Sequence, residues 1–336
     1  MIDSSRHEQE ARIVPIDTAK VRAVVQGVGH GLPEQVLTND DLAKIVDTND
    51  AWITQRTGIR ERRVTREDES IVDLCSRAAL EAIKNSHCQI EDIDMIVVGT
   101  VTGDFPSPSV ACFVQGQIGA FRAFAFDVSA ACAGFIYAVS VATAMIESGQ
   151  IRTALVIGAD TLTKKLQWED RNTSVLFGDA AGAMVLSAST EEDRGVMGSV
   201  LFSDGTGTEA IRVVPEKLDT PGSIHMAGSE VFRFAVQAMG DACSRVVANL
   251  GLTMDDIDLF VPHQANLRII EAAAKRLGLP MEKVFLNVAK YGNTSGGSVP
   301  LALYEAEKEG LLKPGMRVMT VGFGAGLVWG ANVIRW

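Results

Sequence analysis

The sequence predicts an α/β protein made of two similar strand–helix halves that pack as one body. The first observation is an internal repeat, in which IEDIDMIVVGT near residue 93 matches MDDIDLFVPHQ near residue 257, and later segments match in the same order. The offset between matching points stays near 160 to 164 residues, which is the signature of a duplicated unit. The second observation is a set of short apolar runs such as ALVIGA at 154–159, typical of buried, parallel-type strands covered by helices.

Each half alternates strands and helices along the chain. Apolar or β-branched runs that end in glycine or proline turns predict the strands, and amphipathic or Ala-rich stretches predict the helices. Strands are expected at 21–28, 93–99, 124–128, 154–159 and 174–187 in the first half, and near 257–262 and 317–326 in the second. Helices are expected at 41–46, 70–85, 111–118 and within 128–146, with a matching helix that closes near 307–313.

A chain of 336 residues is long enough for two domains or for one large two-part body. We expect a polar, flexible N-terminal extension at 1–20, a first half at 21–190 that carries a nucleophilic cysteine, and a second half at 191–336 that carries a histidine and an asparagine. The extension contains no apolar run of the kind that forms the core of a signal peptide.

Composition argues against several classes of function. The net charge of −11 argues against general nucleic-acid binding, so an acidic partner requires a local basic patch. Five cysteines, an odd number without paired spacing, indicate reduced thiols and a cytoplasmic protein. No C-x-x-C motif or His/Cys cluster suggests a metal site.

Residues 128–146 form a run of nineteen residues without a charge. Its length alone would allow it to cross a bilayer. Asp127 and Glu147 close the run, no basic cluster flanks it, and most of its residues are small or β-branched, so we predict a buried helix instead. Cys132 lies in the predicted first turn, where the helix dipole lowers the pKa of a thiol and favours the thiolate. The alternative is that Cys132 is a small core residue.

A basic segment at 49–66 surrounds Trp52. Its arginines are Arg56, Arg60, Arg62, Arg63 and Arg66. One interpretation is a solvated basic loop anchored by one aromatic side chain. The other is a phosphate-binding lip in which the tryptophan offers a stacking platform.

From the repeat we predict that three chemically active side chains lie near one another. The repeat pairs Cys132 with Asn293 at the start of the equivalent helix, and His263 follows the strand that matches 93–99. Because the ends of such strands converge on one crevice, we expect these three side chains to meet there. The alternatives are a capping histidine and an asparagine in a left-handed turn.

The sequence resembles the β-ketoacyl-acyl carrier protein synthase III enzymes of type II fatty acid synthesis, within the thiolase-fold condensing enzymes. The resemblance runs from about residue 22 to the C-terminus, and its motifs are DAWITQRTGIRERR, FDVSAACAGF, FGDAAGA, GSEVFRFAV, VPHQANLRII, YGNTSGGSVP and GFGAGLVWG. It implies a thiolase-like α/β fold whose two pseudo-symmetric halves form a layered αβαβα body. It also implies an acyltransferase that condenses a short acyl-CoA with malonyl-acyl carrier protein, with loss of CO2.

The resemblance implies a role for each active residue. Cys132 would attack the acyl-CoA thioester and hold the acyl group. His263 and Asn293 would bind the thioester carbonyl of the malonyl group and stabilise the enolate that CO2 loss leaves. The backbone N–H groups of Cys132 and Ala325 would hold the second oxyanion. No metal or other cofactor is implied.

Further positions match the binding surfaces of the family. The residues implied to hold CoA and its pantetheine arm are Trp52, Arg56, Thr57, Arg171, Gly228, Phe232 and Asn266. Those implied to dock the acidic acyl carrier protein are Arg233, Arg268, Lys275 and Arg276. The alternatives are a surface ion pair for Arg171 and a solvated helix face for Lys275 and Arg276. The resemblance also implies a cytoplasmic homodimer without nucleic-acid or membrane partners, in which Phe105 is a candidate residue of the partner's acyl pocket.

Three other functions stay open from the sequence. A related acyltransferase or polyketide-type condensing enzyme of secondary metabolism would use the same Cys-His-Asn triad. A papain-like thiol hydrolase uses the same three residue types, but the duplication counts against it. An inactive dimeric scaffold that has kept the fold is the third. The sequence does not define the starter acyl chain, because the loop at 102–110 is slightly longer than usual in the family.

Overall fold

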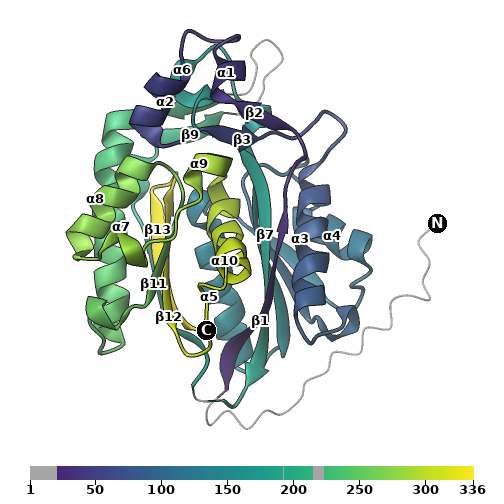
Figure 1. Ribbon diagram of the computed structural model, residues 1–336. Coiled ribbons are helices and arrows are strands. Elements are labelled where there is room, and N and C mark those ends of the chain that lie inside the picture. Colours follow the sequence, from purple (N-terminus) through teal and green to yellow (C-terminus); the bar gives the residue numbers. More distant parts are fainter. Residues whose placement is uncertain (1–20, 192, 215–222) are drawn as a thin grey trace, which may run out of the picture.

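The computed structural model describes residues 21–191, 193–214 and 223–336 (Figure 1). The N-terminal extension predicted at 1–20 lies outside these residues. Two mixed β-sheets stand side by side, with helices between them and on their outer faces.

The first sheet has five strands in the order β1-β7-β6-β4-β5. Their bounds are β1 Arg22–Gly31, β4 Met95–Gly99, β5 Phe124–Val128, β6 Thr153–Thr161 and β7 Asp179–Ser189. β4 runs parallel to β5 and β6, whereas β7 pairs antiparallel with both β6 and β1.

The second sheet has four strands in the order β11-β12-β13-β8. Their bounds are β8 Gly195–Ser203, β11 Leu259–Pro262, β12 Arg317–Gly324 and β13 Val328–Arg335. Only β11 and β12 are parallel, and the other neighbours are antiparallel. The prediction of parallel-type strands is therefore wrong for β1 and β7, because an apolar run reveals burial but not strand direction, and the sequence analysis did not predict β8 and β13.

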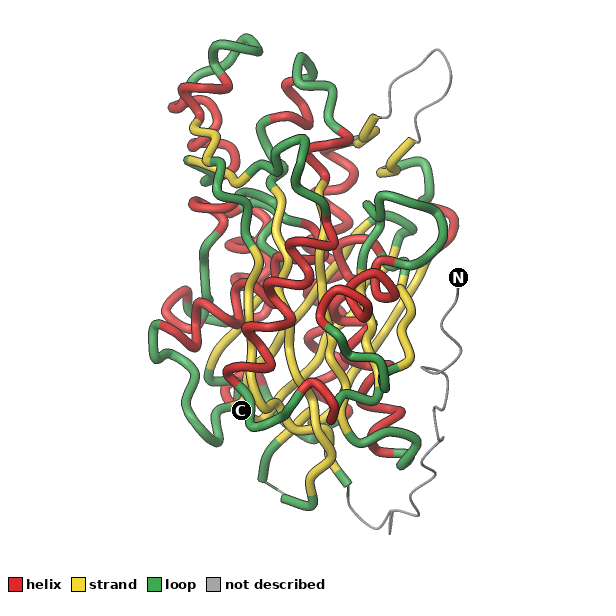
Figure 2. The backbone as a smooth tube through the Cα atoms, turned by 90° about the vertical axis from the view of Figure 1, so that its right-hand side faces the viewer, coloured by secondary structure: helices red, strands yellow, loops and turns green. Residues whose placement is uncertain are grey.

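The helices complete a five-layer α-β-α-β-α body, which confirms the predicted architecture. α5 and α10 lie between the sheets and contact both, whereas α3 and α4 cover the first sheet and α7 and α8 cover the second. Their bounds are α3 Ile71–Asn85, α4 Val110–Ile118, α5 Gly134–Glu147, α7 Gly228–Asn249, α8 Leu267–Leu277 and α10 Ser298–Lys308. Figure 2 views the molecule from the side of α3 and α4.

The two halves repeat one another at constant spacing. β4 and β11, β6 and β12, and α5 and α10 each begin 164 residues apart. The chain leaves the first sheet when β7 ends at Ser189 and enters the second when β8 begins at Gly195. The domain boundary placed at 190/191 stays a prediction.

The charge-free run at 128–146 divides into three parts. Its first residue ends β5, a 3-10 turn follows at Ala131–Ala133, and α5 takes most of the rest. α5 packs directly on β4, since a Cβ atom added to Gly99 would lie 2.3 Å from the carbonyl carbon of Gly134. None of the described helices is long and apolar enough to cross a membrane.

A small cap covers one end of the sheets, at the top of Figure 1. Its elements are α1 Asn39–Leu42, α2 Asp50–Thr57, α6 Arg171–Ser174, β2 Val36–Thr38, β3 Glu61–Arg63, β9 Ile211–Val214 and β10 Ser223–Met226. The helix predicted at 41–46 is the single turn α1. The sequence does not predict α2, although Asn49 caps its start and Gly58, with φ of 77°, ends it.

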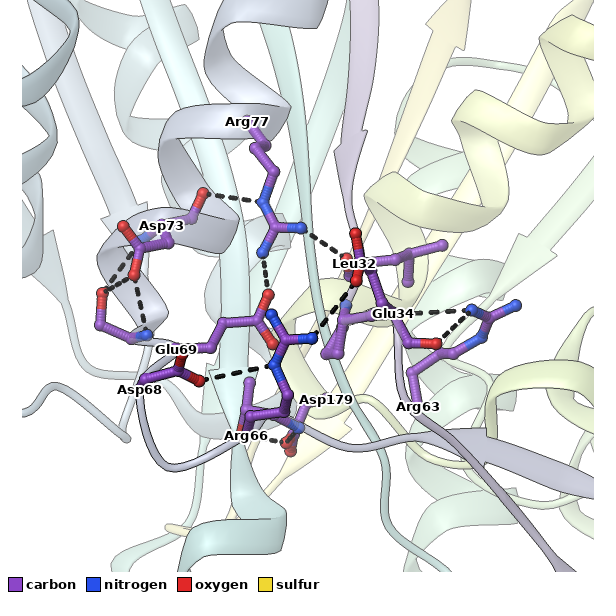
Figure 3. Close-up of polar contacts among 12 residues, drawn as sticks. Leu32, Glu34, Arg63, Arg66, Asp68, Glu69, Asp73, Arg77 and Asp179 are labelled. Carbon is purple, nitrogen blue, oxygen red and sulfur yellow. Dashed lines mark hydrogen bonds and ion pairs between the residues drawn. The ribbon is translucent and has the colours of Figure 1, made fainter.

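Three arginines near Trp52 in sequence take structural roles. Arg62 is fully buried and donates to backbone and side-chain oxygens. Arg63 donates to the carbonyl of Glu34, and Arg66 pairs with the carboxylate of the same residue (Figure 3). The prediction of a phosphate-binding lip around Trp52 is therefore wrong for Arg62, because its guanidinium is buried among Asn39 and the Val175 carbonyl, and it stays a prediction for Arg63 and Arg66.

Candidate active site

Cys132 lies in the 3-10 turn that joins β5 to α5. Ala131, which precedes it, has φ of 44°, a left-handed conformation that residues other than glycine rarely adopt. β12 of the second sheet ends directly against this turn, since a Cβ atom added to Gly324 would lie 2.7 Å from the backbone nitrogen of Cys132. The thiol is therefore placed where the two halves meet.

Ser295 brings the second half into contact with this thiol. It begins the 3-10 turn Ser295–Gly297 in front of α10, and its hydroxyl donates a hydrogen bond of 3.1 Å to Cys132 Sγ. The spacing of 164 residues makes Gly296 the counterpart of Cys132. The predicted pairing of Cys132 with Asn293 is therefore wrong, because Asn293 belongs to the loop that precedes the turn.

His263 follows β11 and is buried, with 1% of its surface exposed. Its backbone nitrogen donates to the Val321 carbonyl of β12, and its Nδ1 lies 2.6 Å from Ser298 Oγ at the start of α10. When the Ser298 hydroxyl donates to Nδ1, Nε2 carries the ring hydrogen and is a donor. Burial lowers the pKa of His263 to about 3, so the imidazole is neutral near pH 7.

Asn293 lies between α9 (Val288–Tyr291) and the turn that begins at Ser295. Backbone hydrogen bonds to Leu176 and Gly178 hold its main chain. Its Oδ1 accepts a hydrogen bond of 2.9 Å from the backbone nitrogen of Ser295. With Oδ1 engaged in this way, the Nδ2 hydrogens are the donors that the amide can offer to a ligand.

Elements of both halves therefore hold Cys132, His263 and Asn293 in one network at the end of β12. Gly324 of β12 contacts the Cys132 turn, Val321 of β12 binds the backbone of His263, and Asn293 supports the turn that contacts the thiol. Their catalytic roles stay predictions.

The state of the free thiol differs from the predicted thiolate. Burial raises the pKa of Cys132 to about 12, a hydrogen bond from Ser295 opposes this rise, and the negative charge of Asp160 adds to it. α5 begins at Gly134, so Cys132 precedes the helix instead of lying in its first turn. The thiol is therefore protonated in the free site at neutral pH.

Trp52, Arg56 and Arg171 form one group on the surface of the cap. The guanidinium carbons of Arg56 and Arg171 lie 4.4 Å and 4.8 Å from the centre of the Trp52 ring. Arg171 also donates to the carbonyl of Asp47 at 2.9 Å. An aromatic surface with two cations beside it suits a flat ring system that carries phosphates. The structure thus brings together three of the residues predicted to hold CoA.

Thr57 and Asn266 already have partners in the same region. The buried Thr57 hydroxyl donates to the Ile53 carbonyl at the end of α2. Asn266 caps α8 through a bond from the Arg268 nitrogen, and its Nδ2 donates to the Arg56 carbonyl at 3.2 Å. These contacts join α8 to α2, and direct CoA contacts by either side chain stay predictions.

The remaining predicted binding residues lie on α7 and α8, which pack side by side. Gly228 begins α7 next to open space, and the half-buried Phe232 follows one turn later. The exposed basic residues are Arg233, Arg268, Lys275 and Arg276. Arg276 forms an ion pair of 3.2 Å with Asp241, which partly offsets its charge. Their roles in binding stay predictions.

Ala325 and Phe105 lie in different surroundings. Ala325 is half-buried and directly follows Gly324, the residue that contacts the Cys132 turn. Phe105 is 59% exposed, and with Phe113 it lines a surface hollow of about 270 Å³ formed by the 102–110 loop, α3 and α4.

Among the described residues, no group of three or more His, Cys, Asp or Glu side chains could hold a metal ion.

Sequence reasoning missed three residues of the site, Ser295, Ser298 and Asp160. The two serines lie within the motif YGNTSGGSVP, in which only the asparagine was assigned a role. Asp160 carried a usable signal, because a carboxylate directly after the apolar run ALVIGA must lie at the end of a buried strand. Its Oδ2 accepts from the Gly296 nitrogen at 3.0 Å.

Two family models match the chain. The model of the 3-oxoacyl-[acyl-carrier-protein (ACP)] synthase III C-terminal region matches residues 247–336, and the model of 3-oxoacyl-[acyl-carrier-protein (ACP)] synthase III matches residues 126–205. The β-ketoacyl-[acyl-carrier-protein] synthase III of Caldanaerobacter subterraneus subsp. tengcongensis is 49% identical over 327 residues, which cover 94% of this chain and 98% of that relative.

Solved structures agree with this match. The crystal structure of 3-oxoacyl-[acyl-carrier-protein] synthase III from Aquifex aeolicus VF5 has a TM-score of 0.90 and 45% identity, covering 94% of this chain and 100% of that one. The priming β-ketosynthase of the R1128 polyketide biosynthetic pathway has a TM-score of 0.89 and 34% identity, with coverages of 96% and 98%. The identity and coverage show that the chain belongs to the β-ketoacyl-acyl carrier protein synthase III family.

Proposed function

We propose that this chain catalyses the condensation that starts type II fatty acid synthesis. A short acyl-CoA and malonyl-acyl carrier protein would give a β-ketoacyl-acyl carrier protein, CoA and CO2. As a member of this family the chain is an acyltransferase of the condensing type. The observation that most directly supports the chemistry is the chain of contacts that links the Cys132 turn and His263 through β12, and Cys132 to the Asn293 loop through Ser295.

In the first half-reaction, Cys132 Sγ attacks the thioester carbonyl of acyl-CoA. The S–H bond breaks, a bond forms between Sγ and the acyl carbon, and the C–S bond to CoA breaks, with the proton leaving on the CoA sulfur. Backbone N–H groups of Cys132 and Ala325 would stabilise the oxyanion that develops on the carbonyl oxygen. One thioester replaces another, so the step needs no external energy source.

In the second half-reaction, Nε2–H of His263 and Nδ2–H of Asn293 would bind the thioester oxygen of the malonyl group. Loss of CO2 leaves an enolate whose oxygen these two donors stabilise. The enolate carbon then attacks acyl-Cys132, the bond between the acyl carbon and the sulfur breaks, and the Cys132 thiolate takes up a proton from solvent. A neutral His263 can donate its Nε2 hydrogen to the enolate oxygen. Neither half-reaction requires a metal or a redox group, so we propose that the enzyme has no cofactor.

The test of this function follows the acyl group by mass spectrometry. The chain is incubated with acyl-CoA thioesters of increasing length and branching, and the mass of the Cys132 peptide is measured. We expect a stable acyl adduct with short starters, and its discharge with release of CO2 when malonyl-acyl carrier protein is added. Free acid released without malonyl would indicate a thiol hydrolase, and the absence of any adduct would refute the proposed function.

A polyketide-type condensing role is the second candidate and is not favoured. The R1128 priming enzyme is 34% identical to this chain, whereas the Caldanaerobacter synthase III is 49% identical.

We propose a cytoplasmic location, because all five cysteines are free thiols in the structure.

Trp52→Ala is expected to raise KM for acyl-CoA by about tenfold or more, because it removes a stacking surface for the nucleotide. The value of kcat should stay close to that of the wild type, since Trp52 lies on the cap and not in the Cys132 network. Steady-state kinetics with acyl-CoA test this expectation, with Trp52→Phe as the matched variant that keeps an aromatic ring. An acyl thioester of N-acetylcysteamine, which lacks the nucleotide, should show no such change, and an equal loss with both substrates would contradict the stacking role.

Lys275→Glu is expected to raise KM for malonyl-acyl carrier protein by about tenfold, because it puts a like charge opposite an acidic partner. Acylation of Cys132 by acyl-CoA should be unchanged. Lys84→Glu, on the exposed end of α3, is the matched charge reversal and should have no effect. The difference between the two variants should shrink as salt is added. A Lys275 variant with normal carrier-protein kinetics would contradict docking at α8.

We also propose a homodimer that forms through the edge of the first sheet. Among the described strands β5 pairs with β4 alone, and two large aromatic side chains near this edge, Phe124 and Phe105, are 42% and 59% exposed. Such an apolar edge favours pairing with a second chain. Phe124→Glu is expected to give monomers in sedimentation velocity, whereas Leu311→Glu, another exposed position, should stay dimeric. A monomeric wild type would rule the dimer out.

A further inference from the structure

The hydroxyl of Ser295 contacts the sulfur of Cys132. The donor–acceptor distance is 3.1 Å, and Ser295 itself is 1% exposed, so little water competes for this bond. The two residues come from different halves of the chain and are brought together only by the packing of one sheet against the other. The proposed roles of Cys132, His263, Asn293 and Ala325 do not involve the Ser295 hydroxyl.

The backbone around Ser295 is held tightly in an uncommon conformation. Ser295 has φ of 50°, a left-handed conformation that residues other than glycine rarely adopt. Its nitrogen donates to Asn293 Oδ1 at 2.9 Å, and the nitrogen of Gly296 donates to Asp160 Oδ2 at 3.0 Å. There is no space to shift the turn toward β6, since a Cβ atom added to Gly158 would lie 2.2 Å from the Gly296 carbonyl oxygen. The surroundings therefore fix the backbone from which the hydroxyl projects, within reach of both the Cys132 sulfur and the Asp160 carboxyl group.

Asp160 anchors this turn to the first half. It is fully buried, and its Oδ1 accepts from the hydroxyl of Thr100, the nitrogen of Val101 and the hydroxyl of Thr102 at 3.0, 2.9 and 2.8 Å. With the carboxylate held by one half, its bond to Gly296 fixes a loop of the other half.

The chemistry of the first half-reaction needs a donor at this position. As Cys132 loses its proton and attacks the thioester, negative charge passes through its sulfur, whose half-buried surroundings include the buried Asp160 carboxylate. A hydrogen bond to an ionised group is roughly twice as strong as one between neutral groups, so a donor fixed on the sulfur lowers the barrier. We propose that Ser295 is a further catalytic residue, whose hydroxyl stabilises the Cys132 thiolate while the thiolate forms and attacks. This inference rests on the proposed role of Cys132 as the nucleophile.

Ser295→Ala and Ser295→Gly together test the proposal. Both remove the hydroxyl, but glycine accepts φ of 50° without strain whereas alanine does not, so the pair separates loss of the donor from disturbance of the backbone. We expect both variants to acylate Cys132 about tenfold to a hundredfold more slowly than the wild type. Alkylation of Cys132 by iodoacetamide, profiled on the Cys132 peptide from about pH 7 to 9, should be about tenfold slower at each pH, because a smaller fraction of the thiol is ionised. Alkylation of Cys88, on the far side of the first sheet, is the internal reference.

Decarboxylation of malonyl-acyl carrier protein supplies the control for an intact site. It depends on His263 and Asn293 and needs no thiolate, so both variants should retain it within about twofold. Wild-type rates of acylation and an unchanged alkylation profile in both variants would overturn the role of Ser295 while leaving the proposed function intact. A slow Ser295→Ala with a normal Ser295→Gly would also overturn it, because backbone strain would then be the cause. Failure of the wild type to acylate would instead refute the proposed function.

Discussion

Cys132→Ser is expected to lose acyl transfer by about 10⁴-fold or more, the scale seen when a catalytic nucleophile is removed. Serine keeps the size and approximate shape of the side chain, but a hydroxyl needs a strong base before it can attack a thioester. His263 is not such a base, because burial lowers its pKa to about 3 and its Nδ1 already bonds to Ser298. The variant should therefore fold, bind acyl-CoA and fail at chemistry.

The measurement is the rate at which acyl mass appears on the protein in a single turnover. Cys88→Ser is the matched control, since Cys88 is a half-buried thiol whose sulfur contacts Ser187 Oγ at 3.5 Å, and a hydroxyl preserves that contact. This control should acylate at the wild-type rate. Acyl mass that still appears in Cys132→Ser, on any residue and at a comparable rate, would show that the nucleophile was assigned wrongly.

The sequence predicts the buried parts of the fold closely. The strand predicted at 154–159 lies within β6, in which every residue is buried, and the helix predicted at 70–85 is α3 with Ser70 as its cap. Both elements have a strong apolar pattern, and burial of that pattern is what stabilises them. α2 was missed because its sequence, DAWITQRT, is polar and weakly amphipathic, so its caps and its contacts with α8 stabilise it more than its pattern does.

The same distinction holds for the residues of the site, since those next to a patterned strand can be predicted and those placed by packing cannot. Cys132 and His263 could be placed from sequence because each follows a strand of the repeat, whereas Asn293 was assigned through a pairing that the structure gives to Gly296. Ser295 could not be assigned to the thiol, since its contact with Cys132 depends on how the two sheets pack and on a positive φ that no residue pattern reveals. The thiolate prediction failed for a related reason. A helix dipole can be inferred from sequence, but the burial of the sulfur and the carboxylate of Asp160 appear only in three dimensions.

His263→Ala and Asn293→Ala are expected to lower the rate of malonyl decarboxylation by about 10²- to 10³-fold each, the usual effect of removing one oxyanion donor. The donors act on the enolate oxygen, which exists only after CO2 begins to leave. Acylation of Cys132 precedes that step and uses backbone donors, so it should stay within about tenfold of the wild-type rate in both variants. The double variant should be little slower than either single variant if the two donors act on one oxygen as a unit.

Separate assays for the two half-reactions test this division of labour. Acyl mass on Cys132 reports the first, and release of CO2 from malonyl-acyl carrier protein reports the second. His87→Ala and Asn249→Ala, which change exposed residues of the same types, are the matched controls and should leave both assays unchanged. Asn293 also has a structural role, because its Oδ1 supports the turn that carries Ser295. If Asn293→Ala slows acylation as strongly as decarboxylation while His263→Ala does not, the asparagine acts on the thiol through that turn as well as on the enolate, and the two half-reactions share one scaffold.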